Sequence, residues 1–404
     1  MTNGDAVTDD AAARALDDVR VIDLSTSVAG TWCTRLLADF GADVIAVEPP
    51  GGSLLRSLAP FADDGTSVIA SYVLANKRSI MLDVGHPQGR RALSAMVRES
   101  QIVVESGTPG TLDSWGIGLD QRDARWPKQI LVSVTPHGQD GGREHLPGND
   151  LTAYAYSGWA SVNGLADREP LKGSGYTGSY LAGVAAYAGA VTALCYADQH
   201  EGEGQHVDVA ESEAAGIVFA PALLATLYAG AVAGRKPGMD LMTGPVPVRD
   251  GHFALTLSRA HFWRDAMTVL GLDELSADRR FDSGWYHREH RDEFMPLVQE
   301  RMAQRDKMEL FDALGTMRVV AGPVLDTAEL SENEHLRARA AFVRPSEDPE
   351  GLEYPGAPFV MSETPWALDR RAPRAGENAV RVLRDAADYT DDWIGGLAEQ
   401  GVLG

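Results

Sequence analysis

Short apolar runs alternate with helical segments between residues 19 and 135, and this alternation constrains the fold more than any other feature. Helical segments at 31–40 and 87–99 separate the runs. Strands joined through helices pair in parallel, and continuously apolar strands are buried on both faces. The alternation therefore predicts an α/β fold with a parallel sheet covered by helices. The candidate strands are 19–25, 43–48, 79–84, 102–105 and 129–135.

The pattern changes after about residue 235. Alternating apolar residues flank Arg249-Asp250-Gly251, which predicts a β-hairpin, and three helical segments follow before a candidate strand at 319–326 that we expect to return toward the first region. We therefore expect a large α/β domain with a parallel sheet, followed by a smaller α+β domain and a C-terminal segment that returns to the large domain. The expected bounds are a disordered leader at 1–18, the large domain at 19–234, the small domain at 235–325 and the returning segment at 326–404.

Charge and cysteine content limit the partners and the compartment. A net charge of −22 over 404 residues argues against nucleic acid or an anionic membrane, since either needs a basic face. The two cysteines, Cys33 and Cys195, suit a reducing cytoplasm. Two uncharged stretches, 173–197 and 214–234, are rich in Ala and Gly, so we interpret them as buried core helices and not as membrane spans.

A glycine-rich turn leads into the first of these apolar stretches. Gly173, Gly175 and Gly178 spell the G-x-G-x-x-G pattern of dinucleotide sites, but the residues before them, DREPLK, do not form an apolar strand. We therefore set the dinucleotide interpretation aside. The chemical group of interest is the hydroxyl of Ser179 at the helix entrance.

A second polar loop ends at Asn149 and Asp150, again before a helix. An Asp in this position commonly caps its own helix, which would be a purely structural role for Asp150. The N-termini of two helices also supply free N–H groups suited to an anionic ligand or a thioester oxyanion. The sequence does not say whether the two helices converge.

Two His-containing pairs have the spacing of metal ligands on a helix. His287 and His290 lie three residues apart, and Glu332 with His335 forms E-x-x-H. A metal site of this type needs a second ligand pair at matching spacing, and none occurs. We therefore predict solvated helix faces and no metal site.

Several blocks in the same order along the chain resemble the family III CoA-transferases, which include the α-methylacyl-CoA racemases. The resemblance implies a Rossmann-like large domain with a small domain, two interlocked subunits, and CoA or acyl-CoA bound as substrate along the large domain without a permanent cofactor. The blocks are VIDLSTSVAG (21–30), LLADFGADVIAVEPPGG (36–52), NKRSIMLDV (76–84), VVESGTPGTLDSWGIG (103–118), EGEGQHVDVAESEA (201–214) and APRAGENAVRVL (372–383). The CoA-contacting positions that it implies are Ser27, Val28, Ala29, Leu82, Ser106, Gly107 and Trp115.

The residues that carry chemistry depart from the family pattern. The transferases place a nucleophilic aspartate in a G-D-x-x-x-G turn, where this chain has Ser179, and no carboxylate occurs between Glu169 and Asp198. A serine hydroxyl is neutral and needs a neighbouring base. The racemases use a His where this chain has Asn149, so two-base racemisation is not supported. Asp150 matches a carboxylate common in the family.

Basic contacts expected near CoA phosphates are also missing. Pro49, Gly85 and Ser114 occupy positions where relatives place Arg or Lys. Phosphates need charge-assisted partners, which the general field of an acidic protein does not supply. Lys77 and Arg78 are the cations nearby, and a structural role suits them equally well.

Three hypotheses remain open. The first is a cytoplasmic enzyme of acyl-CoA metabolism in which Ser179, with Asp150 as base, acts on an acyl thioester or related donor. The second is a non-catalytic subunit that pairs with an Asp-bearing paralogue in place of a homodimer. The third is a non-enzymatic binding protein on the same fold.

Overall fold

A computed structural model describes residues 13–404 except 219, 236–243 and 258–259. The chain forms two compact units. Of the described residues, those within 1–160, 172–232 and 340–404 form the larger unit, and those within 161–171 and 233–339 form the smaller unit. Residues 161–171 and 326–339 thus belong to the smaller unit. Of the expected disordered leader, residues 1–12 lie outside the described residues, whereas Leu16 packs into the core of the large unit.

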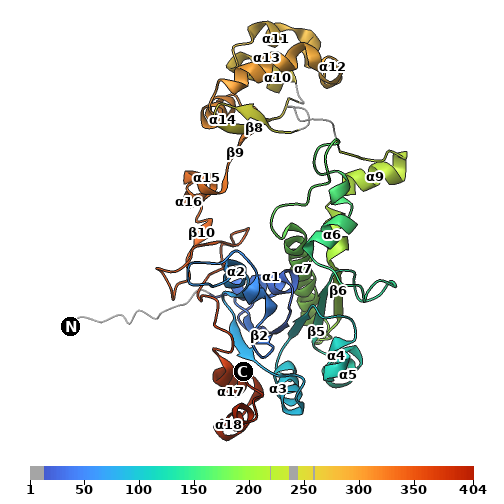
Figure 1. The fold of residues 1–404 in the computed structure, drawn as a ribbon, viewed down its shortest axis with the longest axis vertical. Coiled ribbons are helices and arrows are strands. Elements are labelled where there is room, and N and C mark those ends of the chain that lie inside the picture. Colours follow the sequence, from blue (N-terminus) through green and yellow to red (C-terminus); the bar gives the residue numbers. More distant parts are fainter. Residues whose placement is uncertain (1–12, 219, 236–243, 258–259) are drawn as a thin grey trace, which may run out of the picture. The chain divides into compact units, whose positions relative to one another are not determined.

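The large unit is built on a six-stranded parallel sheet in the order β3-β2-β1-β4-β5-β6 (Figure 1). The α/β parallel-sheet prediction is thereby confirmed. The first five strands match the predicted runs to within three residues at each end, and β6 adds an edge strand that the sequence pattern did not reveal. The strands are β1 (Arg20–Leu24), β2 (Asp43–Glu48), β3 (Arg78–Met81), β4 (Ile102–Glu105), β5 (Ile130–Thr135) and β6 (His206–Ala210).

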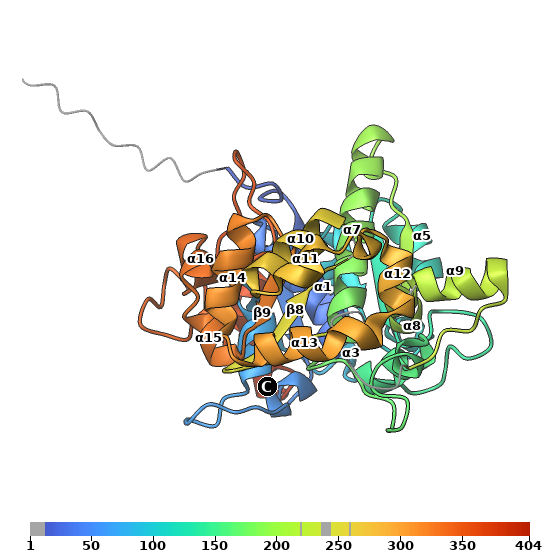
Figure 2. The ribbon, with the colours of Figure 1, turned by 90° about the horizontal axis from the view of Figure 1, so that it is seen from above.

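Alternate residues of each strand feed two separate cores, one on each face of the sheet. Val21 packs beneath α1 (Val28–Asp39) and α7 (Thr177–Gln199), which lie side by side in Figures 1 and 2. Its neighbour Ile22 packs on the opposite face against α3 (Pro87–Arg98), α17 (Ala379–Ala387) and α18 (Asp391–Glu399). Helices on both faces explain why the strands are apolar at consecutive positions.

The strand order reverses between β1 and β4, which defines the topological switch point of the sheet. Both strands continue into helices at their carboxyl ends, where α1 follows β1 and α4 (Thr111–Trp115) follows β4. In open α/β sheets, ligands bind at this carboxyl edge beside the switch point. A ligand-binding site of the large unit is therefore expected at this carboxyl edge.

Residues that follow the smaller unit complete the core of the large unit. The segment 366–370 is fixed by Asn76, whose side chain donates to the carbonyl of Ala367 at 2.7 Å and accepts the N–H groups of Asp369 and Arg370. Asp83 beyond β3 donates its N–H to the carbonyl of Val402 at 2.9 Å. The large unit is thus discontinuous in sequence.

The smaller unit contains an antiparallel three-stranded sheet packed against helices. The predicted hairpin is present as β7 (Val246–Val248) and β8 (Gly251–Leu255). The strand predicted at 319–326 is present as β9 (Ala321–Val324), which pairs antiparallel with β8.

The helices of the smaller unit bury a histidine that we expected on a solvated face. His287, in α12 (Gly284–Glu289), is 1% exposed and lies 4.4 Å from the ring of Trp263 in α10 (Ala260–Val269). Burial lowers the pKa of His287, so the imidazole packs as a neutral aromatic ring. The expectation of one solvated face was wrong because α12 ends at Glu289, and His290 is its partly exposed C-cap.

The two long apolar stretches differ in their surroundings. By length and composition α7 could cross a membrane, yet its small residues pack on α1 and the sheet, as in a core helix of a globular domain. The second stretch was expected to be buried, and this is wrong. It forms α8 (Glu211–Ile217) and α9 (Ala220–Ala229), in which Ile217, Leu227 and Tyr228 are at least 70% exposed.

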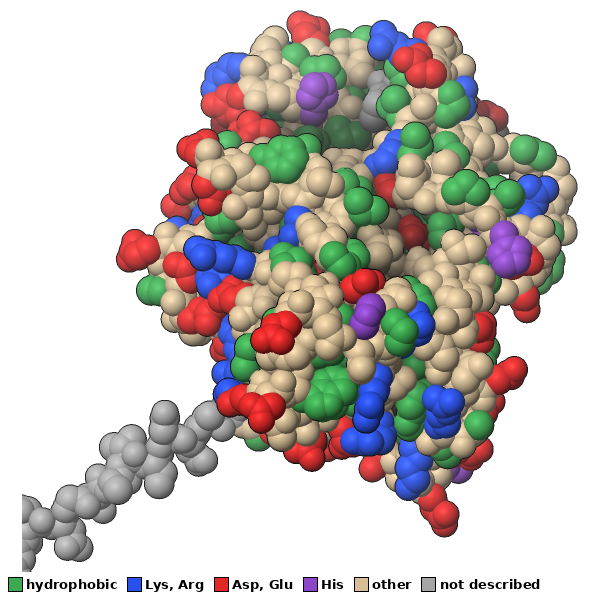
Figure 3. Space-filling model, turned by 60° about the horizontal axis from the view of Figure 1, so that its bottom comes forward, with side chains coloured by type: hydrophobic (Ala, Val, Ile, Leu, Met, Phe, Trp, Pro, Cys, Tyr) green, Lys and Arg blue, Asp and Glu red, His purple; other side chains and the backbone are tan. Residues whose placement is uncertain are grey.

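Acidic and basic side chains are interspersed over the face drawn in Figure 3. The basic residues form small groups among the acidic ones and not one continuous basic surface on that face. The net charge of −22 is therefore not accompanied there by a broad basic area of the kind that binds a polyanion.

Candidate active site

Ser179 lies in the first turn of α7. Its backbone N–H and its hydroxyl are both hydrogen-bonded to carboxylates. Its backbone N–H donates to Asp150 Oδ1 at 2.9 Å, and its hydroxyl donates to Glu211 Oε2 at 3.0 Å. All three residues are at most 6% exposed. The neighbouring Tyr180 packs edge-on against Trp32 of α1 at 5.2 Å, which fixes the turn against the start of α1.

Asp150 links the N-termini of two helices. It is the first residue of α6 (Asp150–Tyr156), but Asn149 is the cap of that helix and forms a capping box with Thr152. The Asp150 carboxylate is thereby left to cap α7, whose own cap residue, Tyr176, makes no side-chain bond. The N-termini of α6 and α7, whose relative position the sequence did not give, therefore meet. Asn149 caps α6 and is itself exposed to solvent.

Lys172 neutralises Asp150. Its ammonium lies 2.7 Å from Asp150 Oδ2, although not in hydrogen-bond geometry, and its side chain is 29% exposed. Asp150 accordingly accepts a backbone N–H on one oxygen and has a cation beside the other. The serine hydroxyl does not bond to it.

Glu211 is the site residue that the sequence did not reveal. It begins α8 directly after β6, and its side chain is 3% exposed. Burial raises the pKa of Glu211, the bond from Ser179 lowers it, and the charge of Asp150 raises it further, with a net increase. Among the described residues, no Lys or Arg forms an ion pair with Glu211. The acid lies 32 residues beyond Ser179, and the sequence pattern marked neither the strand that precedes it nor the helix that it begins.

The arrangement pairs a hydroxyl with a carboxyl group of increased basicity. A hydroxyl becomes nucleophilic when a group within hydrogen-bond reach removes its proton, and a carboxyl with a raised pKa removes it more effectively. The first turn of a 23-residue helix adds a positive dipole end. The geometry thus gives Ser179 what a neutral nucleophile requires, with Glu211 in the place that we expected Asp150 to hold.

Three of the expected CoA-contacting positions follow the carboxyl ends of β1 and β4, the two strands of the switch point. The Ser106 hydroxyl, after β4, accepts the backbone N–H of Ser27 at 3.1 Å and that of Thr26 at 2.9 Å. Gly107 donates its N–H to Glu105 at 2.6 Å, and a Cβ at this glycine would lie 3.2 Å from Thr111. Ser27, Ser106 and Gly107 therefore line the carboxyl edge where a ligand of an α/β sheet would lie.

The other expected contacts are positioned by packing. Val28 and Ala29 are buried in the first turn of α1, and Leu82 is 1% exposed in the core beneath α3. Trp115 ends α4 and packs against that same core. Any ligand contact by the first three would involve the backbone, because their side chains are enclosed.

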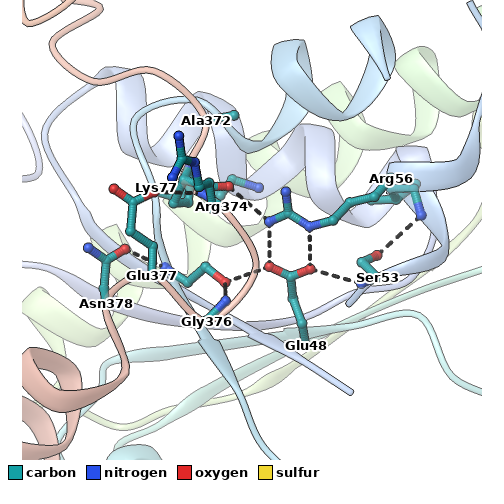
Figure 4. A network of polar contacts seen from close by, with 12 residues as sticks. Glu48, Ser53, Arg56, Lys77, Ala372, Arg374, Gly376, Glu377 and Asn378 are labelled. Atoms are coloured by element: carbon teal, nitrogen blue, oxygen red, sulfur yellow. Dashed lines mark hydrogen bonds and ion pairs between the residues drawn. The ribbon is translucent and has the colours of Figure 1, made fainter. Parts of the chain in front are cut away.

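A polar network holds the carboxyl end of β2 (Figure 4). Glu48 accepts bonds from Arg56 at 2.6 and 2.7 Å, from the Ser53 N–H at 2.8 Å and from the Ser79 hydroxyl at 2.5 Å. Burial acts to raise the pKa of Glu48, but the bonds from Arg56 and Ser79 lower it on balance. Gly376 donates to Ser79, so the returning C-terminal segment closes the network.

The two cations at the start of β3 are both held in ion pairs. Lys77 is 2% exposed and donates to Asp23 at 2.9 Å, to the Thr31 carbonyl at 2.8 Å and to the Thr34 hydroxyl at 2.7 Å. Burial lowers the pKa of its ammonium. Arg78 pairs with Asp43. Both residues have structural roles, so neither replaces the basic contacts missing at Pro49, Gly85 and Ser114.

A cavity of about 730 Å³ lies beside the Glu48 network. Its basic lining residues are Arg56, Arg371 and Arg374. Arg56 is paired with Glu48 and Arg371 with Glu377, whereas the exposed Arg374 has no ion pair among the described residues. Arg374 is therefore the cation of this cavity that is open to a ligand.

The large unit is thus an α/β fold in which the first residues of α6 and α8, Asp150 and Glu211, meet Ser179 in the first turn of α7. The sequence matches the profile of CoA-transferase family III over residues 16–379, and the chain belongs to this family. Membership places it among enzymes of acyl-CoA metabolism. The similar proteins described next match this chain over nearly their whole length.

Two relatives and one solved structure illustrate the similarity. The succinate–glutarate CoA-transferase of Agrobacterium fabrum is 30% identical, over 92% of this chain and 95% of its own. A subunit of the succinyl-CoA:(R)-benzylsuccinate CoA-transferase of Thauera aromatica is 30% identical, over 90% and 92%. The crystal structure of a CAIB/BAIF family protein from Brucella suis superposes with a TM-score of 0.83 at 27% identity, covering 92% of this chain and 99% of its own.

Proposed function

We propose that this chain acts on an acyl-CoA thioester without the aspartate nucleophile of its family, using Ser179 in its place. The observation that carries the proposal is the 3.0 Å hydrogen bond from the Ser179 hydroxyl to Glu211, a buried carboxyl group. A neutral hydroxyl at the family's nucleophile position is useful for chemistry only with such a partner. Ser179, Asp150 and Glu211 form the proposed site, and Asn149 contributes through the cap of α6.

Thiol release tests this proposal. The protein is titrated calorimetrically with CoA, acetyl-CoA and succinyl-CoA, and free thiol is then followed over time. We expect binding and slow thiol release, with release abolished in Ser179→Ala and retained in the matched control Ser174→Ala, an exposed serine of the preceding turn. Unchanged release in Ser179→Ala removes Ser179 from the mechanism.

A second candidate is a non-catalytic subunit that pairs with an Asp-bearing paralogue. Two observations favour it: the Thauera aromatica relative is itself named as a subunit, and this chain lacks basic side chains at Pro49, Gly85 and Ser114. Co-expression with a paralogue that carries Asp in the turn would give a stable, active heteromer. A homodimer that ignores the paralogue counts against it. Binding of CoA without thiol release in either assembly would leave a non-enzymatic binding protein.

The proposed assembly is an interlocked homodimer in the cytoplasm. Support comes from the apolar surface of α8 and α9, where Ile217, Leu227 and Tyr228 are exposed in the single chain. Large contiguous apolar surfaces usually mark an interface. A second copy of the chain, or the paralogue, is the partner that we propose for this surface.

A further inference from the structure

The identity of the nucleophile decides which group can move. When a carboxylate attacks a thioester, its own carbonyl carbon can afterwards carry CoA, so CoA itself is passed to a second acid. A hydroxyl has no carbonyl carbon. Ser179 can hold an acyl group as an ester, but it has no atom on which CoA could be held as a thioester.

We propose that this site transfers the acyl group and not CoA, with Glu211 shuttling the proton and with a proton-bearing acceptor such as water, an alcohol or an amine. The inference rests on the proposed function, because it requires Ser179 to meet a thioester. It changes the class of the second substrate. A carboxylate acceptor brings no proton and is not expected to serve.

The steps balance without any additional reagent. In the first, the Ser179 Oγ–carbon bond forms and the carbon–sulfur bond of the thioester breaks. The hydroxyl proton passes to Glu211 and from there to the leaving CoA sulfur. In the second, the acceptor oxygen or nitrogen attacks the ester, its proton passes to Glu211, and the proton returns to Ser179 Oγ as the ester bond breaks. No atom changes oxidation state.

The contacts favour Glu211 over Asp150 as the proton carrier. The hydroxyl donates to Glu211 at 3.0 Å, whereas Asp150 is bound to a backbone N–H and lies 2.7 Å from the Lys172 ammonium. Asp150 is therefore committed to the cap of α7 and to a cation, and it forms no hydrogen bond with the hydroxyl. Glu211 has no ion pair among the described residues.

The contacts also favour Glu211 as a base and not as a replacement nucleophile. Its Oε2 faces the Ser179 hydroxyl inside a buried cluster. Burial and the charge of Asp150 both raise the pKa of Glu211, although the bond from Ser179 lowers it. The same increase strengthens it as a proton acceptor.

Intact-protein mass spectrometry after brief exposure to succinyl-CoA tests the inference. We expect an adduct with the mass of the acyl group, mapped to Ser179, and thiol release that increases severalfold with hydroxylamine but not with acetate. Enzyme-free and Ser179→Ala reactions correct for the direct reaction of hydroxylamine. Glu211→Gln should slow adduct formation by about 10²-fold or more, the usual contribution of a general base. Glu213→Gln, an exposed acid of the same helix, should not change it.

The outcomes separate this inference from the proposed function. An adduct with the mass of CoA on Glu211, or turnover that needs a carboxylate acceptor, overturns acyl transfer and leaves activity on thioesters intact. Full-rate acylation in a folded Glu211→Gln variant overturns the role of Glu211. Absence of both binding and adduct defeats the proposed function itself. Ser179→Cys, which keeps a nucleophile of similar size, should form the corresponding thioester if Ser179→Ala fails to fold.

Discussion

Lys77 shows how a cation that looked available for a ligand can be fully committed to the fold. Its ammonium has three acceptors, two of them from α1, and none of its side chain reaches solvent. It follows Asn76, which binds the C-terminal segment and donates to Asp39 at 2.5 Å. Two consecutive side chains before β3 therefore tie together α1 and the end of the chain.

Replacing Lys77 with Met should lower the free energy of unfolding by about 3–5 kcal/mol, because it leaves the Asp23 carboxylate buried without its cation. Urea denaturation of the purified protein measures the change. Lys128→Met, at an exposed lysine, is the matched control and should change stability by less than about 0.5 kcal/mol. Equal stability of the two variants would contradict the assigned role.

Glu211 should make stability fall as pH increases. Its pKa is raised in the folded state, so the folded protein holds the proton more tightly, and this contribution is complete below the ordinary Glu value of 4.5 and is lost as pH rises through the folded value. Glu211→Gln cannot ionise. The Tm of Glu211→Gln minus the Tm of the parent should therefore increase from pH 4 to pH 8. Titratable groups facing Glu211 are Asp150, from α6, and beyond it Lys172, and both are retained in the variant.

Thermal unfolding across that range measures the effect. Glu213→Gln, at an exposed acid, should give a difference that does not vary with pH. A constant difference for Glu211→Gln would mean that Glu211 titrates normally.

At the scale of single residues, Ser179 and Asp150 could be identified from the sequence, but the contact between them could not. Both stand at helix entrances, where polar residues are recognisable. Glu211 also begins a helix, but an acid in a first turn is ordinary and its distance of 32 residues from Ser179 gave no signal of contact. Only its contact with the Ser179 hydroxyl in the structure identified Glu211 as a residue of the site.

Packing between elements depends most visibly on small residues where α1 and α7 cross. A Cβ at Gly183 would lie 2.6 Å from the Ala29 carbonyl and 2.8 Å from the Trp32 ring. Neither neighbour is the free end of a flexible chain. The glycine therefore permits close contact of the two helices and, through it, places the Ser179 turn beside α1.

Gly183→Ala should destabilise the protein by about 1–3 kcal/mol, even though Ala is the better helix former, because the new methyl overpacks the crossing. Gly395→Ala is the control: Gly395 lies in α18, and a Cβ added there would meet no atom within 4 Å, so the substitution should stabilise by up to about 1 kcal/mol. Opposite signs in denaturant melts are expected. Stabilisation by both substitutions would refute the close crossing.

The elements of the buried sheet could be predicted, whereas its edge could not. β2 (DVIAVE) and β4 (IVVE) are apolar except for charged residues at their ends, and both begin and end at the predicted residues. β6 has the sequence HVDVA and is only partly buried. Its His and Asp interrupt the apolar run by which the other strands could be predicted. Likewise α1 begins at Val28 and not at residue 31, because the Ser27 side chain caps the Gly30 N–H.

On the scale of the whole molecule, interlocking would constrain how subunits exchange. Two chains linked through one another separate only when one of them opens. We expect that two differently tagged preparations, mixed as native proteins, form no hybrid dimers over hours, whereas co-refolding gives hybrids in statistical proportion. Tandem affinity capture followed by mass spectrometry measures this. Rapid exchange between native proteins would exclude interlocking.

The divided large unit has a consequence for biosynthesis. Ile22 and Leu93 share a core with Leu383 and Leu397, so a nascent chain cannot finish that face of the sheet until residues near 400 have left the ribosome. The smaller unit, made of 161–171 and 233–339, has all of its residues by position 339 and is able to fold earlier. During translation, half-covered strands are therefore exposed for the longest time, and chaperones that shield apolar surface have most to protect there.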